Sequence, residues 1–503
     1  MSITQPLSHR TESATALRRC LAIRDALSRD GLYSGSAEAP EGARFRVSPS
    51  PFFLSPQELD FFERLGDHLL AFYRGLDQLY MDSARGTQPA WVAAYLDQGK
   101  PDSLAAYSRL KRWRDQLPGV IRPDVIPMAD GMVITELDSV PGGIGLTGAL
   151  GRAYADVTRH SLLVTRELTQ PSVLSPQSYK IVGGPDGMVE GFDALVREAA
   201  GPRQGAIAIV VSDEAKDYRP EMRWLAERLQ ERGSDVACIE PRDLRFTEEG
   251  LWLDGPRGSR RVSLVYRFFE LFDLPNVPKA DLLMYSAQGA RVAVTPPFKP
   301  ALEEKLAFAL LHHPALRPFW EKALGDETFG LLARLLPRTW ILDPRPIPPS
   351  AVIPGLTLGG RALSDFRDLA GAGQKARRLV IKPSGFSELA WGSRGVSIGH
   401  DLPQSEWAAA LDLALDSFTT TPYVLQEFHK GKQFELSYCG DHGETVVPMA
   451  GRARLSPYYF VTGGRAKLGG ILATVCGIEK KVIHGMKDAI MAPCALAPEA
   501  SAR

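Results

Sequence analysis

The chain has 503 residues and a formal net charge of zero, with 59 basic and 59 acidic residues. This length exceeds one ordinary hydrophobic core, so we expect two or three domains. The balanced charge creates no long-range field that would attract nucleic acid, and no apolar run approaches the roughly 20 residues that span a bilayer. Neither nucleic acid nor a membrane is therefore expected as a partner.

The cysteines indicate the compartment. Five are scattered along the sequence, and no two form a C-x-x-C pair. This pattern argues against a disulfide framework or a structural zinc site, and it is typical of a reducing environment. The first 20 residues also lack the apolar core of a signal peptide. We therefore expect a cytoplasmic protein.

Residues 1–117 predict a helical region. In "SPQELDFFERLGDHLLAFYRG", which starts at Ser55, a capping box precedes apolar residues at helical spacing. "PDSLAAYSRLKRW" predicts a further helix. Next, "VIRPDVIPM" (120–128) and "GMVITEL" (131–137) predict two strands joined by a short turn. This strand pair and the glycine loop after it form the predicted segment 118–175.

The rest of the chain divides into two blocks. Residues 176–300 alternate apolar strands with helices, which predicts a Rossmann-like parallel sheet covered on both faces. "ALEEKLAFALLHH" (301–313) predicts a helix, and the strands up to residue 490 predict a mixed α+β module. The last residues, 491–503, are expected to be a disordered tail. The predicted fold class is thus α/β and α+β.

The stretch "VITELDSVPGGIGLTGAL" (133–150) raises the first question of function. Its glycines fit the G-x-G-x-x-G spacing of a dinucleotide-binding turn, but "DSVP" separates them from the strand. Glu136 and Asp138 lie two apart on that strand, so they share one face. Magnesium bound to a triphosphate prefers such carboxylates. A dinucleotide turn, a turn without ligand and a metal–triphosphate site remain alternatives.

Three further segments carry candidate nucleotide contacts. Lys382 ends the apolar strand "RLVIKP", where a lysine is costly unless a phosphate or another anion pairs with it. Lys305 lies on the predicted helix at 301–313. The strand "YVLQEF" ends in residues that would suit an adenine ring: Gln426, Glu427 and Phe428. The alternatives are an exposed strand-end lysine, a solvated helix lysine and an ordinary edge strand.

Two segments carry further cations. Arg267 lies in the strand "LVYRFF", where a carboxylate or phosphate partner would justify a guanidinium. "GRARLSPYYFVTGGRAKLGGILAT" (451–474) places four basic residues between glycines. This composition suits a mobile anion-binding loop, with a solvated β-hairpin as the alternative.

The order of these motifs resembles that of the circularly permuted ATP-grasp proteins, which include eukaryotic-type glutathione synthetase and glutathionylspermidine synthase-like proteins. The order is R-x-D, E-x-[DN] with a glycine loop, Y-R, a lysine, K-P, a strand ending in Q-E and a basic glycine loop. The resemblance covers roughly residues 118–480. It implies an ATP-grasp module with an inserted Rossmann-like substrate domain at 176–300 and a nucleotide-binding and lid region at 301–490.

The resemblance also implies residue roles. Glu136 and Asp138 match the magnesium ligands, and Glu388 is available as a third. Lys305 and Lys382 match the lysines that contact the phosphates, and Gln426, Glu427 and Phe428 match the hinge beside the adenine. The implied substrate contacts are Arg122, Arg267, Gly142 and Gly143. The implied lid spans 463–470 and carries Arg465 and Lys467, which with Lys382 and Arg267 are the expected catalytic cations.

The function that the resemblance implies is ATP-dependent ligation of a carboxylate to an amine or a thiol. ATP and Mg²⁺ are the expected cofactors, and a small amino-acid or peptide-like acid and an amine are the expected substrates. Such chemistry requires no protein nucleophile, in keeping with the lack of a recognisable Ser-His-Asp or Cys-His set. A non-catalytic ATP-binding homologue and a dinucleotide-dependent oxidoreductase remain alternatives, and a homodimer remains open.

Overall fold

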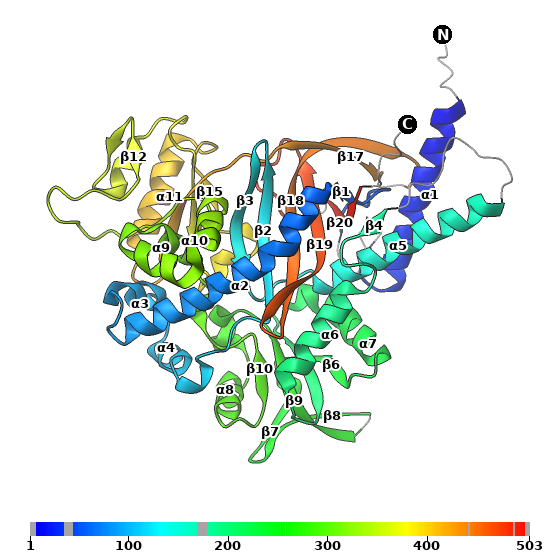
Figure 1. Ribbon diagram of the computed structural model, residues 1–503, viewed down its shortest axis with the longest axis horizontal. Coiled ribbons are helices and arrows are strands. Elements are labelled where there is room, and N and C mark those ends of the chain that lie inside the picture. Colours follow the sequence, from blue (N-terminus) through cyan, green and yellow to red (C-terminus); the bar gives the residue numbers. More distant parts are fainter. Residues whose placement is uncertain are drawn as a thin grey trace, which may run out of the picture.

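The computed structural model describes residues 7–34, 44–167, 179–256, 258–440, 443–485 and 488–497. The fold is mixed α/β. A large sheet occupies the centre of the molecule, an α/β block lies at one side of it, and a smaller sheet lies at another (Figure 1). None of the helices in these described ranges is both long and apolar enough to cross a membrane.

The large sheet joins segments from the whole chain. Its main strand order is β1 (Phe52–Leu54), β20 (Ile490–Leu496), β19 (Arg465–Gly477), β18 (Val446–Thr462), β2 (Val120–Met128) and β3 (Gly131–Asp138). Two more strands pair at its side, β17 (Gln433–Cys439) with β18 and β4 (Lys180–Ile181) with β20. The long hairpin β18–β19 turns at Gly463 and Gly464, which have positive φ angles of 57° and 73°. Two successive residues with positive φ are typical of the tightest hairpin turns.

Helices cover both faces of this sheet. Successive side chains of a strand point to opposite faces, so one strand contributes to both cores. Tyr459 lies in the core under α2 (Pro56–Ala84) and α10 (Arg317–Leu335). Its neighbours Tyr458 and Phe460 lie in the other core, with α5 (Ile144–Glu167), α6 (Gly187–Ala200) and α7 (Arg219–Glu231). The expected capping box begins α2, with Ser55 as its N-cap. The remaining N-terminal helices are α1 (Leu7–Arg29), α3 (Ala90–Asp97) and α4 (Asp102–Ser108).

The α/β block contains the expected parallel strands. They lie in the order β6 (Val236–Ile239), β5 (Ala206–Val211), β9 (Gly258–Phe268) and β10 (Ala293–Thr295). All six residues of β5 are buried, as its uninterrupted apolar run predicts. A hairpin of β7 (Leu244–Thr247) and β8 (Gly250–Gly255) extends from β9, and α8 (Ala280–Gln288) leads to β10.

The small sheet is antiparallel and has its own core. Its order is β11 (Thr339–Ile341), β16 (Tyr423–Glu427), β14 (Leu379–Pro383) and β15 (Ser397–Ile398). Helix α11 (Gln404–Asp416) packs on it through the buried Trp407. The segment between β11 and β14 adds the short hairpin β12 (Thr357–Leu358) and β13 (Arg361–Ala362).

Two expectations about secondary structure are wrong. Within the expected disordered tail at 491–503, residues 491–496 belong to β20, because they pair with β19 and β1 inside the large sheet, and residues 498–503 lie outside the described residues. The predicted helix at 301–313 is broken into a 3₁₀ turn (Pro300–Glu303) and α9 (Ala307–His312), and Lys305 lies in the turn between them. The expected boundary between the segments 118–175 and 176–300 lies outside the described residues.

Candidate functional site

Strands β2 and β3 bring four charged side chains together. Arg122 is the register partner of Asp138, and Asp124 is the partner of Glu136. Because residues two apart on a strand share a face, all four lie on one side of the ribbon. The Arg122 guanidinium lies 2.9 Å from Asp138 and 3.3 Å from Asp124. The acidic pair predicted from the sequence is thus neutralised in part by a predicted substrate-side arginine.

Strand β18 adds a second arginine to this group. Arg454 Nη1 donates to Asp124 at 3.0 Å, and Ser456 Oγ donates to the other carboxylate oxygen at 3.0 Å. Burial raises the pKa of Asp124, but Arg454 and Arg122 outweigh it and hold the pKa below its usual value. Asp124 is therefore ionised at neutral pH and pairs with both arginines.

Two lysines from separate segments reach the same strand. Lys305 Nζ lies 2.9 Å from Glu136. Lys382 Nζ donates to the carbonyl of Thr135 at 3.0 Å and to Gln426 Oε1 at 2.8 Å. Burial lowers the pKa of Lys382 to about 8, although the nearby Glu136 opposes this change. The ammonium is thus held in a site that would gain from an added anion.

The position of Lys305 depends on its neighbours. Glu303 pairs with Arg267 of β9, and Glu304 pairs with the fully buried Lys100 before α4. Glu304 also accepts from Ser384 Oγ at 2.6 Å, just after Lys382. The two glutamates before Lys305 therefore anchor this turn to the α/β block, the N-terminal helices and the small sheet.

Two clefts meet at this cluster. One, of about 790 Å³, lies between the small and large sheets and is lined by Lys382, Gln426, Glu427 and Phe428. The other, of about 690 Å³, borders the glycine loop and is lined by Arg122, Asp138, Gly142 and Gly143. Asp124, Glu136 and Arg454 line both clefts. The cluster therefore forms the boundary between a cleft beside the predicted adenine hinge and a second cleft.

The glycine loop itself binds a protein carboxylate. Glu221 of α7 accepts from the backbone amides of Gly143 at 2.6 Å and Leu146 at 2.9 Å, at the start of α5. A Cβ added to Gly145 would lie 2.2 Å from the carbonyl oxygen of Glu221, so the close approach of α7 requires a glycine there. Since Glu221 and α7 occupy the position that a pyrophosphate would need, the dinucleotide interpretation is wrong.

Several predicted site residues lie elsewhere. Arg267 is fully buried and donates to the carbonyls of Pro296, Phe269 and Pro297 besides pairing with Glu303. The guanidinium lines neither cleft, so the structure does not bring Arg267 together with the other expected substrate contacts, Arg122, Gly142 and Gly143.

The predicted lid is also corrected. Residues 463–470 form the tip and first part of the β18–β19 hairpin rather than a mobile loop. Arg465 pairs with Asp67 of α2 at 2.6 Å, while Glu198 of α6 binds the amide of Gly463. Neither Arg465 nor Lys467 lines the two clefts. The alternative of a β-hairpin in the sequence interpretation was the right one.

Glu388 does not join the other two expected metal ligands. It is exposed at the start of a short 3₁₀ turn and lines neither cleft. Among the described residues, no group of three or more His, Cys, Asp and Glu side chains could hold a metal ion by itself. The two carboxylates of Glu136 and Asp138 are sufficient for a magnesium ion that also binds phosphate oxygens, since such ions use one or two carboxylates.

The sequence interpretation missed Asp124, and it placed Arg454 only among the four basic residues of an expected anion-binding loop. Both carried a usable signal. Arg122 and Asp124 are two apart, as are Arg452 and Arg454, and this spacing on a strand places each pair on one face. Which strands would lie side by side was not readable from that spacing, because β2 and β18 are separated by more than 300 residues.

Comparison with known proteins shows a shared fold. No protein-family model and no curated protein matches the sequence. Among solved structures, the chain resembles a glutathione synthetase-like effector from Globodera pallida in its apo form. The two share 12% sequence identity with a TM-score of 0.55, over 96% of this chain and 97% of that one. At this identity the similarity establishes a shared overall fold and nothing more.

A second similarity is weaker. A protein from Methylobacillus flagellatus, provisionally named a gamma-glutamylcysteine synthetase, matches at 9% identity and a TM-score of 0.35. The match covers 84% of this chain and 85% of that one. A score this low carries no argument about the chain.

Proposed function

We propose that this protein is an ATP-dependent ligase that joins the carboxyl group of a small amino-acid or peptide-like acid to an amine. One observation carries the proposal. Glu136, Lys305 and Lys382 come from three distant segments: Glu136 lines both clefts, Lys382 lines the cleft between the sheets, and Lys305, which lines neither cleft, pairs with Glu136 beside a small cavity that all three line. The fold shared with a glutathione synthetase-like protein is consistent with this reaction.

In the proposed arrangement, the cleft between the two sheets holds ATP. Gln426, Glu427 and Phe428 line its wall at the end of β16, where backbone groups and the Phe428 ring suit a planar base. Lys382 and Lys305 lie farther in, at the cluster, and would contact the phosphates. Their positive charge offsets the negative charge of a triphosphate in a partly buried site.

The second cleft would hold the acid. Arg122 and Arg454 flank its junction with the nucleotide cleft, so the substrate carboxylate would lie between them and the terminal phosphate. In such a ligase the carboxylate oxygen attacks the terminal phosphorus and ADP leaves. The amine nitrogen then attacks the acyl carbon, and inorganic phosphate and a proton are released. The chain needs to supply charge and alignment for these steps, and no nucleophile.

Glu136 and Asp138 would hold magnesium together with phosphate oxygens. When bound, this ion supplies Lewis-acid stabilisation of the phosphoryl group. Glu136 is suited to the role because Lys305 and Lys382 outweigh the effect of burial and hold its pKa below the usual value. The carboxylate is therefore ionised throughout the physiological pH range.

Positional isotope exchange tests this function without knowledge of the amine. ATP labelled with ¹⁸O in the β–γ bridge is incubated with the protein, Mg²⁺ and a panel of amino acids and dipeptides. We expect scrambling of the label into the non-bridging β positions only when a suitable acid is present. The absence of scrambling with every acid, despite saturating ATP, would overturn the proposed ligase activity.

A non-catalytic nucleotide-binding protein is the second candidate. The observation that favours it is the position of Glu388, which leaves the expected third metal ligand outside the clefts. Such a protein would bind Mg-ATP through Lys305 and Lys382 but show no acid-dependent isotope exchange. Binding measured by calorimetry in parallel with the exchange experiment separates the two candidates.

A further inference from the structure

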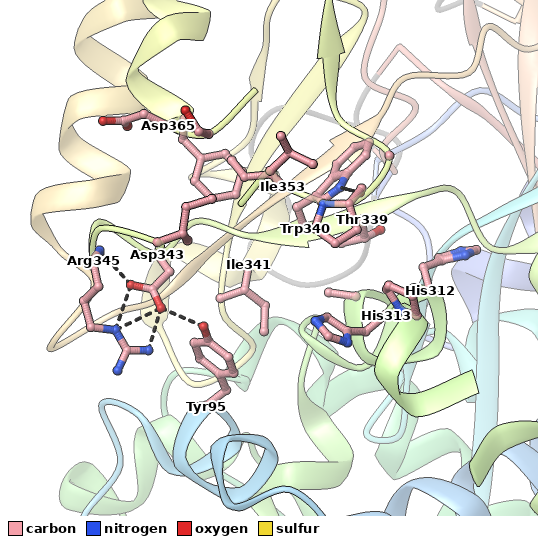
Figure 2. A pocket seen from close by; sticks show the side chains of 18 of the residues that line it. Tyr95, His312, His313, Thr339, Trp340, Ile341, Asp343, Arg345, Ile353 and Asp365 are labelled. Carbon is pink, nitrogen blue, oxygen red and sulfur yellow. Dashed lines mark hydrogen bonds and ion pairs between the residues drawn. The ribbon is translucent and has the colours of Figure 1, made fainter. Parts of the chain in front are cut away.

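A separate cavity lies beside β11, and Thr339, Trp340 and Ile341 of that strand line it (Figure 2). Its volume is about 890 Å³, larger than either cleft at Lys382 and within the range of ligand-binding pockets. None of its lining residues lines those clefts. A ligand in this cavity would therefore be distinct from the proposed nucleotide and substrates.

The walls of the cavity are aromatic and aliphatic. Figure 2 shows Tyr95 of α3, His313 after α9, and Trp340 of β11 around one space, with Ile353 on the facing segment. Trp340 Nε1 donates to the carbonyl of Pro354 at 2.8 Å, which fixes the proline-containing segment 344–354 as one wall. This hydrogen bond therefore holds two walls of the cavity together.

Apolar side chains at the rim remain open to solvent. Val352 is 50% exposed and Ile347 is 36% exposed, although both are large hydrophobic residues. They lie on the same wall as Ile353 and Pro354. An apolar ligand body would bury this surface and gain roughly 25 cal/mol for each Å² removed from water.

Most polar groups around the cavity are already satisfied. Asp343 accepts from Tyr95 Oη at 2.6 Å and from Arg345 Nε at 2.9 Å. Burial lowers the pKa values of His312 and His313, so both imidazoles are neutral at pH 7. These groups leave no net charge that would attract a cation.

Arg338 is the exception. Its guanidinium forms no ion pair with any residue in the described part of the chain. It lies directly against the proline-containing wall, since a Cβ added to Gly355 would lie 2.4 Å from Arg338 Nη1. An arginine beside an aromatic cavity, with its donors available, suits a planar anionic group.

We propose that this cavity is a second ligand site, which binds a small aromatic organic anion. The aromatic body lies against Trp340 and Tyr95 and covers Val352, while the carboxylate or sulfonate pairs with Arg338. This proposal does not rest on the ligase function, because it uses no residue of the Lys382 cluster.

Two matched fluorescent probes test the proposal. 8-Anilino-1-naphthalenesulfonate carries an aromatic body and an anion, and N-phenyl-1-naphthylamine has the same body without the charge. We expect one equivalent of the anionic probe to bind the native full-length protein. Arg338→Gln should weaken its binding by about tenfold and leave the uncharged probe unchanged, because only the charged hydrogen bond is lost.

Further variants locate the bound probe. Val352→Glu should weaken both probes, because it places a carboxylate on the apolar rim. Leu413→Glu is the matched control, since Leu413 is 59% exposed on α11 and does not line the cavity. Should Val352→Glu fail to fold, Ser364→Trp fills the cavity from an exposed position and has the same expected effect.

Other results would contradict the proposal. Unchanged binding of the anionic probe in Arg338→Gln and in the rim variant would overturn it. Loss of the probe in Lys382→Met or its displacement by ATP would place it in the nucleotide cleft instead, and would equally overturn the second site. Absence of acid-dependent isotope exchange would refute the ligase function and leave this site unaffected.

Discussion

Replacement of Lys382 by methionine tests whether this lysine serves nucleotide binding or the stability of the fold. The side chain is only 9% exposed, and its pKa falls from the ordinary 10.5 to about 8. At 1.36 kcal/mol for each pKa unit, holding the charge at neutral pH costs about 3 kcal/mol. Methionine removes this cost, but it leaves the Thr135 carbonyl and Gln426 Oε1 without their donor, at about 1 kcal/mol each.

The balance favours the variant by about 1 kcal/mol. We therefore expect Lys382→Met to have an unchanged Tm or one raised by about 1 °C in thermal unfolding at pH 7. The same variant should bind a non-hydrolysable ATP analogue about 100-fold more weakly in calorimetry, because one charged phosphate contact is lost. Unchanged or raised stability together with weaker nucleotide binding is the result expected for a residue that is retained for function at a cost in stability.

The pH dependence of stability gives a second readout for the same variant. The folded state releases the Lys382 proton near pH 8 and the unfolded state near 10.5, so the unfolded state binds more protons in between. The stability of the wild-type protein therefore gains a contribution as pH rises through this window. The advantage of Lys382→Met in Tm should disappear by about pH 10.

Lys299→Met is the matched control. Lys299 is also buried, but its Nζ lies 2.9 Å from Asp77, and neither residue lines either cleft. Removing it leaves a buried carboxylate alone and should destabilise the protein by about 3 kcal/mol without weakening the ATP analogue. If Lys382→Met behaved like this control, with lost stability and unchanged nucleotide affinity, the reasoning for Lys382 would be refuted.

Two further predictions concern the cluster and the glycine loop. Arg454→Gln should lower acid-dependent isotope exchange by about tenfold or more, because Arg454 lines both clefts. The control Arg465→Gln, at the hairpin tip, should have no effect on this exchange. Equal effects of the two substitutions would contradict the placement of Arg454 in the site. Burial raises the pKa of Glu221 to about 7, so the folded state binds more protons than the unfolded state between pH 4.5 and 7, and this contribution to stability is lost as pH rises. The Tm of Glu221→Gln relative to wild type should therefore increase from pH 5 to pH 7.5, and a constant difference would count against the raised pKa.

Local sequence patterns predicted the helices and strands better than they predicted the tertiary contacts of these elements. The two strand segments on either side of a short turn predicted β2 and β3, and the capping box at Ser55 predicted the start of α2. Lys305 was placed on a helix because its apolar neighbours have helical spacing. The turn found there follows from ion pairs of Glu303 and Glu304 with residues 36 and 204 positions away, which no local pattern contains.

Basic glycine-rich segments were the least predictable part of the site. Arg452, Arg454, Arg465 and Lys467 lie within 16 residues of one another and have similar neighbours. Only the pairing of β18 with β2 shows that Arg454 reaches Asp124, and only the packing of the hairpin tip on α2 shows that Arg465 does not. The choice between these arginines depends on tertiary contacts and not on spacing.

The central claim is that Glu136, Lys305 and Lys382 surround one Mg-bound triphosphate. A crystal structure of the protein with a non-hydrolysable ATP analogue and Mg²⁺ tests it most directly. We predict phosphates within hydrogen-bonding distance of both lysine Nζ atoms, the metal on Glu136 and Asp138, and the base beside Phe428. A nucleotide bound elsewhere, such as in the cavity beside β11, with these side chains still paired to one another, would contradict it.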